Sequence, residues 1–229
     1  MTESGITPTA PDQCPSEPGR NCPLCPRLVS FRESIQGQHP GWHNAPVPSF
    51  GDRNASLLIV GLAPGLQGAN RTGRPFTGDY AGDLLYSTLL NFEFSRGIFA
   101  ARPDDGLELI NCRITNAVRC VPPENKPTPE EIRTCRPFLA SVMSEMPNLR
   151  AVLALGKIAH DSTVRALAGR IAEYPFLHGG SRTLGTVRLF SSYHCSRYNT
   201  NTGVLTKAMF EAVFADIAAF LLQCEQSNG

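Results

Sequence analysis

Three short apolar runs constrain the fold of this chain more than any other feature of its sequence. They cover residues 57–60, 151–156 and 187–191, and each run leads into glycine or polar residues. Runs of this length between turn residues are typical of buried strands. A further strand is predicted over about 107–118, with a break near Asn111.

Helical patterns separate these predicted strands. Apolar residues at helical spacing predict helices over about 82–94, from Thr128 onward, over 157–168 and over about 203–223. The second helix starts with a capping box, T-P-E-E at 128–131, and Gly169 can end the third. Strands that alternate with helices predict an α/β fold with about four mainly parallel strands and helices on both faces.

The composition fits one domain. The chain has 229 residues, 41% of them hydrophobic, which suffices for a sizeable core. Residues 1–20 are rich in Ser, Thr, Pro and Gly and predict a disordered tail, so that a single domain spans 21–225. Residues 27–54 predict a covering segment in which Trp42 is packed. No apolar run reaches the ~20 residues of a membrane span, and no secretory signal precedes the domain. We therefore expect a cytoplasmic protein without membrane contact, and a monomer.

The loop after the first strand, Gly61–Asp79, contains five glycines and two prolines and is therefore a shaped loop. It lies at the carboxyl end of a predicted parallel strand, where open α/β sheets bind ligands. Asp79 ends the loop as its lone carboxylate. The alternative interpretation of Asp79 is a helix cap, because aspartate is a favoured capping residue.

Polar motifs that end at Asp79, Asn116 and His194 each follow a predicted strand, so they should converge on one edge of the sheet. The stretches around them, 53–78, 109–123 and 174–210, contain arginines but no acidic residue. The formal net charge is only +1, yet this distribution is the footprint of phosphate binding.

The side chains of these motifs suit recognition and release of a nucleobase. Asn116 presents an acceptor beside a donor, which complements uracil and hypoxanthine and rejects cytosine. His194 could donate to a carbonyl oxygen of a leaving base, and Phe76 could stack on the base. Each has a simpler alternative: Asn116 bonding its own backbone, a structural His194, and Phe76 as a core aromatic.

Eight cysteines without an export signal indicate a reducing compartment, where metal ligands and buried thiols are commoner than disulfides. Cys22 and Cys25 form a Cys-x-x-Cys hook, which fits zinc, a redox pair or an iron–sulfur site. With Cys120 and Cys135 they make a set of four that suits zinc or a [4Fe–4S] cluster. Cys14 lies in the predicted tail and is not expected to be a ligand.

Five stretches resemble the iron–sulfur branch of the uracil-DNA glycosylase superfamily, known as family five or type b. They are G-L-A-P-G at 61–65, N-R-T-G-R-P-F-T-G-D at 70–79, T-N-A-V-R-C-V-P-P-E-N-K-P-T-P at 115–129, T-C-R-P-F-L at 134–139 and S-Y-H-C-S-R-Y-N-T-N-T-G at 192–203. The resemblance implies a three-layer α/β/α sandwich and hydrolysis of deaminated bases, uracil and hypoxanthine among them, from DNA. It also implies a structural [4Fe–4S] cluster on Cys22, Cys25, Cys120 and Cys135.

The motifs and their charges give candidate site residues. The candidate catalytic residues are Asp79, Asn116 and His194. The candidate base-binding residues are Gly61, Ala63, Gly65, Phe76, Asn116 and Asn199. The candidate DNA-binding residues are Arg71, Arg74, Arg197 and Tyr198.

Leu62 and Ala63 match the pattern of this branch, and Cys195 is the one departure from it. Leu62 and Ala63 stand where sister families have a group that orients water, and neither can do so. Asp79 is then the carboxylate of interest, either as a base or as a stabiliser of the sugar cation. Cys195 follows His194 where the family usually has proline, so the loop loses proline's fixed φ.

The sequence therefore predicts a DNA glycosylase that flips a deaminated base out of the helix. It predicts a monofunctional enzyme, because no lysine stands in these motifs to form a Schiff base. The rival hypothesis is a non-catalytic iron–sulfur module that binds DNA or senses redox state.

Overall fold

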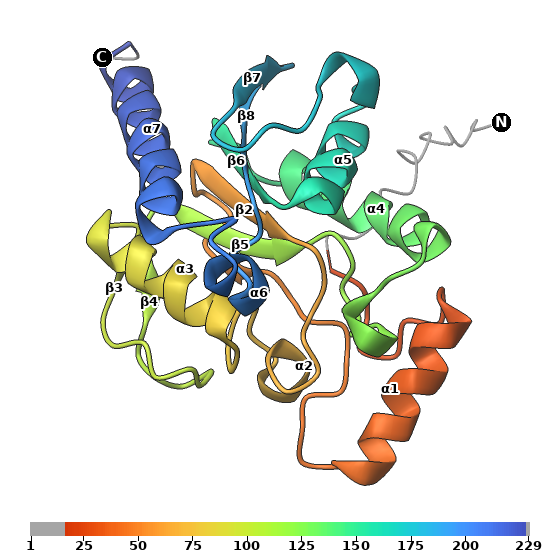
Figure 1. Ribbon diagram of the computed structural model, residues 1–229. Coiled ribbons are helices and arrows are strands. Elements are labelled where there is room, and N and C mark those ends of the chain that lie inside the picture. The colour runs from red at the N-terminus through yellow and green to blue at the C-terminus, as the bar shows by residue number, and fades with distance from the viewer. Residues whose placement is uncertain (1–16, 228–229) are drawn as a thin grey trace, which may run out of the picture.

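The computed structural model describes residues 17–227, and its elements form three layers around a central sheet (Figure 1). Within this part of the chain the sheet has six strands in the order β1-β5-β2-β6-β8-β7. The inner strands are parallel to one another: β5 (Cys112–Asn116), β2 (Leu57–Gly61), β6 (Ala151–Leu155) and β8 (Val187–Ser192). The predicted α/β fold is confirmed.

Two antiparallel strands at the sheet edges were not predicted. β1 (Phe50–Gly51) pairs with β5, and β7 (Ser181–Leu184) pairs with β8. Both are short and largely solvent-accessible, so neither has the apolar run by which the inner strands are recognised.

The inner strands are apolar throughout because both faces of the sheet are buried. Leu57 and Ile59 belong to one hydrophobic cluster, whereas Leu58 and Val60 belong to a second cluster on the opposite face. The same alternation along β6 explains why these runs lack the period-2 polarity of half-exposed strands.

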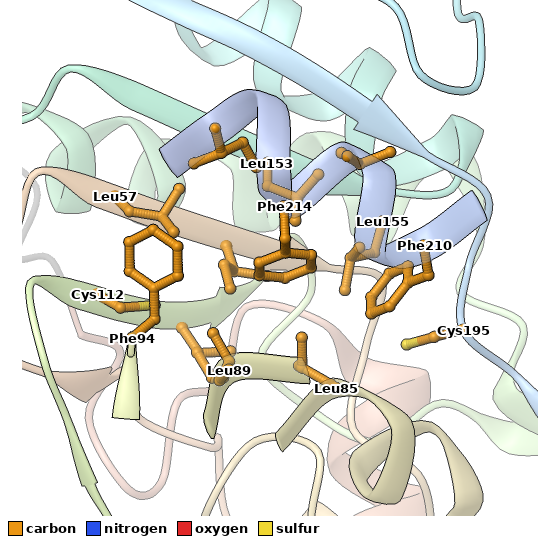
Figure 2. Packing of buried hydrophobic residues seen from close by; sticks show 14 of the residues in the cluster. Leu57, Leu85, Leu89, Phe94, Cys112, Leu153, Leu155, Cys195, Phe210 and Phe214 are labelled. Atoms are coloured by element: carbon orange, nitrogen blue, oxygen red, sulfur yellow. The ribbon is translucent and has the colours of Figure 1, made fainter. Parts of the chain in front are cut away.

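Two helices cover each face of the sheet. α3 (Tyr80–Asn91) and α7 (Lys207–Gln226) pack on the face where Phe210 and Phe214 meet Leu85 and Leu89 (Figure 2). α4 (Pro129–Ser144) and α5 (Lys157–Ala166) supply the opposite layer.

Capping residues determine where the helices begin. The capping box of α4 is confirmed: the Glu131 amide donates to Thr128 Oγ1 at 3.2 Å, and the Thr128 amide donates to Glu131 Oε2 at 2.7 Å. α3 begins two residues earlier than predicted because Asp79 caps it. The last helix begins later, because Thr206 caps α7 after a separate short helix, α6 (Arg197–Asn201).

The end of α5 differs from the prediction. The helix stops at Ala166, and Ala168 adopts the left-handed conformation (φ +59°) that was expected of Gly169. Gly169 is needed for space instead, because a Cβ there would lie 3.0 Å from Val164 Cγ1.

The N-terminal segment is more ordered than predicted. α1 (Pro26–Gln38) lies within the expected covering segment, and it escaped prediction because it buries only Leu28, Arg32 and Ile35. Short elements complete the described chain: α2 (Ala69–Thr72), β3 (Ser95–Arg96), β4 (Glu108–Leu109) and two 3-10 turns, Pro123–Asn125 and Ile171–Glu173. Asn111 breaks the chain between β4 and β5, as predicted, with φ +48°.

Most of the predicted tail, including Cys14, lies outside the described residues. Its last residues contact the domain, contrary to the prediction that the tail extends to residue 20. Glu17 Oε2 lies 3.1 Å from Arg119 Nη1, and Arg20 donates to the His43 carbonyl at 2.9 Å. No helix in residues 17–227 combines the length and the apolar character needed to cross a membrane.

Candidate active site

Asn116 and Gly61 lie side by side at the carboxyl ends of β5 and β2. Asn116 is buried, and a Cβ on Gly61 would clash with Asn116 Oδ1 and lie 2.6 Å from Phe76 Cζ. Glycine is therefore required at position 61, because the amide and the ring already occupy the space beside it. Among the described residues the Asn116 side chain forms no hydrogen bond with its own backbone, so that alternative has no support.

Phe76 connects Asn116 to His194. Its ring lies next to the Gly61 and Asn116 pair, and its centroid is 6.1 Å from that of the His194 imidazole. Phe76 is also buried in the core cluster, which confirms the core interpretation, while stacking on a base stays a prediction. Its backbone has φ +56°, an unfavourable conformation for a bulky residue, which persists only where the surroundings impose it.

His194 lies two residues beyond the end of β8, and its imidazole is neutral. Burial lowers the pKa of His194 from 6.5 to about 4. The Asn199 side-chain amide donates to the His194 carbonyl at 2.8 Å, so Asn199 holds the loop that carries the imidazole. A contact of Asn199 with a base stays a prediction.

Asp79 caps α3 and also faces the glycine loop. Its Oδ1 accepts from the Gly82 amide at 3.0 Å, so the capping role is real. Its Oδ2 points at the loop: Cβ atoms on Gly65 and Gly68 would lie only 3.2 and 3.1 Å from it. Partial desolvation by the surrounding protein raises the pKa of Asp79, although the Gly82 amide opposes this effect.

Ala63 lies on the other side of the first motif. It packs at the edge of the cluster that contains Cys120 and Cys135, whereas Gly61 and Gly65 face the Asn116 and Asp79 side chains respectively. A contact of Ala63 with a base through its backbone stays a prediction.

Three of the predicted DNA-binding side chains are exposed, and two of them, Arg71 and Arg197, lie beside the chain neighbours of Asp79. Arg71 is exposed, and its Nη2 lies 3.2 Å from the position of a Cβ on Gly78. The Arg197 guanidinium lies 5.8 Å from the ring centroid of Tyr80, and Tyr198 is 74% exposed on α6. These side chains can reach a ligand outside the protein.

The prediction that Arg74 contacts DNA is wrong. Arg74 is 4% exposed, and its guanidinium donates two hydrogen bonds of 2.8 Å to Asp105. Two other arginines of the acid-free stretches have partners within the protein. Arg53 lies 3.5 Å from Glu145, and Arg113 donates to the Gly51 carbonyl at 2.7 Å. Fewer cations thus face the site than the sequence suggested.

The four predicted ligand cysteines line one cavity. Cys22 and Cys25 precede α1, Cys120 follows β5, and Cys135 lies in α4; Leu28, Val118 and Phe138 pack among them. Within residues 17–227, no three groups of ligand type are arranged to hold a single metal ion. Four thiols around one cavity can hold either a zinc ion or a metal–sulfur cluster.

The polar partners of this cavity are donors and cations. Arg32 Nη1 donates to Cys120 Sγ at 3.5 Å, and the Arg119 amide donates to Cys135 Sγ at 3.4 Å. Arg32 is 5% exposed, and no carboxylate in the described chain lies within ion-pair distance of it. Burial raises the pKa of Cys25 to about 11 and that of Cys135 to about 12, so unligated thiols would be neutral. A buried guanidinium against sulfur fits an anionic group in the cavity.

Comparison with known proteins decides the family. The model of the uracil DNA glycosylase superfamily matches residues 48–218 of the chain. The chain belongs to this superfamily. It is 45% identical to the Type-5 uracil-DNA glycosylase of Thermus thermophilus over 202 residues, covering 85% of this chain and 91% of the relative. It is 40% identical to that of Pyrobaculum aerophilum over 203 residues (87% and 88%) and 42% identical to that of Mycobacterium bovis over 205 residues (85% and 76%).

The resemblance to family five is therefore confirmed, and this uracil-DNA glycosylase is a hydrolase of N-glycosyl bonds that removes uracil from DNA. Two of its residues escaped the sequence analysis. Arg32 would have been found from Pro26, which is a favoured first helical residue and places Arg32 on the buried side of α1 with Leu28. Asp105 has no local signal, because its partner Arg74 is 31 residues away.

Proposed function

We propose that this glycosylase flips a uracil or a hypoxanthine out of DNA and releases it with a water molecule. The observation that carries the proposal is the grouping of Asn116, Phe76 and His194 beside Gly61. A flat base needs a ring to stack on and a polar group at its edge, and this group of side chains offers both.

Asn116 is proposed to select the base. Its side-chain oxygen accepts from a ring N–H while its nitrogen donates to the adjacent carbonyl oxygen. Uracil and hypoxanthine both carry that pair, whereas cytosine presents an acceptor beside an amine. Burial of Asn116 supports the selection, since a mismatched polar group would be left without a partner.

Asp79 and His194 are proposed to act on the two charges that develop as the bond breaks. The leaving base becomes negative, and a neutral imidazole can donate a hydrogen bond to its carbonyl oxygen. The sugar becomes positive, and the Asp79 carboxylate can stabilise that charge or deprotonate the attacking water. The raised pKa of Asp79 favours the second role without excluding the first.

Arg71, Arg197 and Tyr198 are proposed to contact DNA around the flipped nucleotide, because all three are exposed and Arg71 and Arg197 lie beside the chain neighbours of Asp79. The mechanism is proposed to be monofunctional. Lys157 lines a groove with His194, but its Nζ is paired with Asp161 at 2.6 Å, and no lysine stands within the three motifs to form a Schiff base with the sugar.

A [4Fe–4S] cluster is proposed to be held by Cys22, Cys25, Cys120 and Cys135. When bound, it would join the N-terminal hook to β5 and α4, which is a structural role, since glycosidic hydrolysis transfers no electrons. Arg32 would supply a positive charge beside it. We also propose that the protein is a monomer and works in the cytoplasm, where thiols stay reduced.

The test is a panel of duplex oligonucleotides that contain uracil, hypoxanthine or only normal bases, incubated with the purified protein and then treated with alkali. Alkali-dependent breakage at uracil and hypoxanthine supports the proposal. Breakage at uracil alone would contradict the base recognition proposed for Asn116. Breakage without alkali, or trapping of the protein on DNA by borohydride, would contradict the monofunctional mechanism.

A further inference from the structure

A buried ion pair anchors the segment that carries Phe76 and Asp79. Arg74 Nη1 and Nη2 donate to Asp105 Oδ1 and Oδ2, both at 2.8 Å. The side chain of Asp105 has no exposed surface. A two-point pair between planar groups determines orientation as well as distance, which a single contact does not.

Asp105 is itself held in place. Its carboxylate also accepts from the Ala100 amide at 2.8 Å and from the Leu107 amide at 3.1 Å. Hydrogen bonding to Arg74 keeps the pKa of Asp105 well below its usual range, so the carboxylate stays charged. These hydrogen bonds from its own loop fix the Asp105 carboxylate, and the fixed carboxylate in turn orients the Arg74 guanidinium.

Aromatic rings surround the Arg74 guanidinium. Its Cζ lies 5.1 Å from the ring centroid of Phe50, 5.3 Å from that of Tyr86 and 5.7 Å from that of Phe99. The Tyr86 hydroxyl donates to the Pro75 carbonyl at 2.8 Å, one residue after Arg74. The cage therefore restrains both the guanidinium and the backbone that leads to Phe76.

The restraint continues to the reacting groups. The Thr77 hydroxyl donates to the Arg74 carbonyl at 2.7 Å and closes a turn around Phe76. Phe76 sits in this turn with its unfavourable positive φ, which only its neighbours can maintain. Asp79 follows two residues after Thr77 and has its Oδ2 directed at the loop glycines.

We propose that Arg74 and Asp105 are positioning residues that hold Phe76 and Asp79 in the geometry needed for base removal. This inference rests on the glycosylase activity proposed above. A buried ion pair is often replaceable by apolar residues without loss of stability. Here the ion pair holds the segment 74–79 in one orientation. Loss of the pair should therefore lower the rate of base removal more than the stability of the fold.

The test compares Arg74→Lys and the double variant Arg74→Met/Asp105→Leu with the wild type. Arg74→Lys keeps the charge and loses the two-point contact; the double variant removes both charges together. Single-turnover uracil release should slow at least about tenfold in both. Binding to abasic-site DNA should change less than about twofold. The double variant should still fold and unfold cooperatively, at a somewhat lower temperature, because the Ala100 and Leu107 amides lose their acceptor. Hydrogen–deuterium exchange should increase in residues 72–79.

The matched control is Arg96→Lys, which alters an exposed pair with Glu108 on the neighbouring β3–β4 ribbon and should change neither rate nor exchange. Wild-type rates in both variants would overturn the proposal, as would unchanged exchange in 72–79. A double variant that does not fold would also overturn it, because the pair would then be needed for stability. A wild-type protein that releases no uracil would instead contradict the proposed function.

Discussion

Asp79 shows how one residue meets two demands with its two oxygens. Oδ1 caps α3, and Oδ2 faces the loop where the reaction is proposed to occur. From the sequence these roles are alternatives, but in the structure they are compatible, because the cap fixes the carboxylate relative to the end of the helix. Capping is therefore a means of orienting the group.

Replacement of Asp79 by asparagine separates the two roles, because asparagine caps helices as well as aspartate does. We expect Asp79→Asn to lower single-turnover uracil release by about 10²- to 10⁴-fold. The unfolding temperature and the affinity for abasic-site DNA should stay close to wild type. Equal losses of release and of DNA affinity would show that Asp79 serves the fold alone.

The pKa values of the site predict its pH dependence. Asp79 must be charged to act, and its pKa is raised, so the rate should fall as the pH drops through that raised value. His194 is neutral at every pH above about 4, so no inflection is expected near the ordinary histidine value of 6.5.

This profile can be measured as single-turnover rates between about pH 4 and about pH 9. In Asp79→Asn the acid limb should be absent. A wild-type inflection near 6.5 that disappears in His194→Asn would mean that the imidazole titrates in the working range.

Gly61 is expected to tolerate no side chain. In Gly61→Ala the new Cβ would clash with Asn116 and lie 2.6 Å from Phe76 Cζ, which should displace the groups that hold the base. We expect uracil release to fall at least about tenfold, with far-UV circular dichroism unchanged. Gly37→Ala is the control, since a Cβ at Gly37 meets nothing within 4 Å. Full activity of Gly61→Ala would place the base elsewhere.

At the scale of elements, α4 connects local sequence to the cysteine cavity. Its capping box fixes the first turn, and Cys135 lies in its second turn. Glu131 also accepts two hydrogen bonds of 2.7 Å from Arg27 of α1, so the same carboxylate joins α4 to the helix that follows the cysteine hook. The start of α4 thus helps to place Cys135 relative to the Cys22 and Cys25 hook.

Loss of the Thr128 cap should destabilise the protein modestly. Thr128→Ala is expected to cost about 1 kcal/mol of unfolding free energy, which for a chain of this size corresponds to a drop of about 2–4 °C in Tm. Differential scanning calorimetry measures the change. Thr183→Ala, on the exposed edge strand β7, should leave Tm within about 1 °C of wild type. A Thr128→Ala protein as stable as wild type would show that the cap is redundant.

At the scale of the whole molecule, the parallel sheet gathers distant segments at one edge. β2 and β8 end just before the loops that bear Asp79 and His194, and β5 ends at Asn116 between them. The cysteine cavity lies where the N-terminal hook meets the chain after β5 and α4. The N-terminal segment therefore packs on the domain through this cysteine cluster, which is separate from the two clusters that pack on the faces of the sheet.

The proposed cluster can be tested through Arg32. Arg32→Met removes the buried charge beside Cys120 at similar side-chain length, and we expect less iron and acid-labile sulfide per chain, with a lower Tm. Arg133→Met, an exposed arginine of α4, is the control and should retain wild-type iron. Wild-type iron and sulfide in Arg32→Met would contradict the role of Arg32, and zinc in the wild-type protein would contradict the cluster.

Much of the fold could be read from local signals. The inner strands are unbroken apolar runs because both faces of the sheet are buried. The start of α4 was predicted from the capping box of Thr128 and Glu131. The edge strands and α1 could not be read in this way, because they bury too little surface to leave a pattern. Asp79, Asn116 and His194 each come at or after the end of a predicted strand. The carboxyl ends of parallel strands lie at one edge of the sheet, so these residues were expected at that edge.

The sequence by itself determined the order of strands and helices, the residues at the carboxyl ends of the strands and the family, because these depend on neighbours along the chain. Only the tertiary structure decided what each arginine does. Arg71 and Arg74 stand three residues apart in one acid-free stretch, yet Arg71 is exposed and Arg74 is buried against Asp105. The physical reason is that a buried charge depends on a partner brought close by folding, and that partner comes from a loop far along the chain.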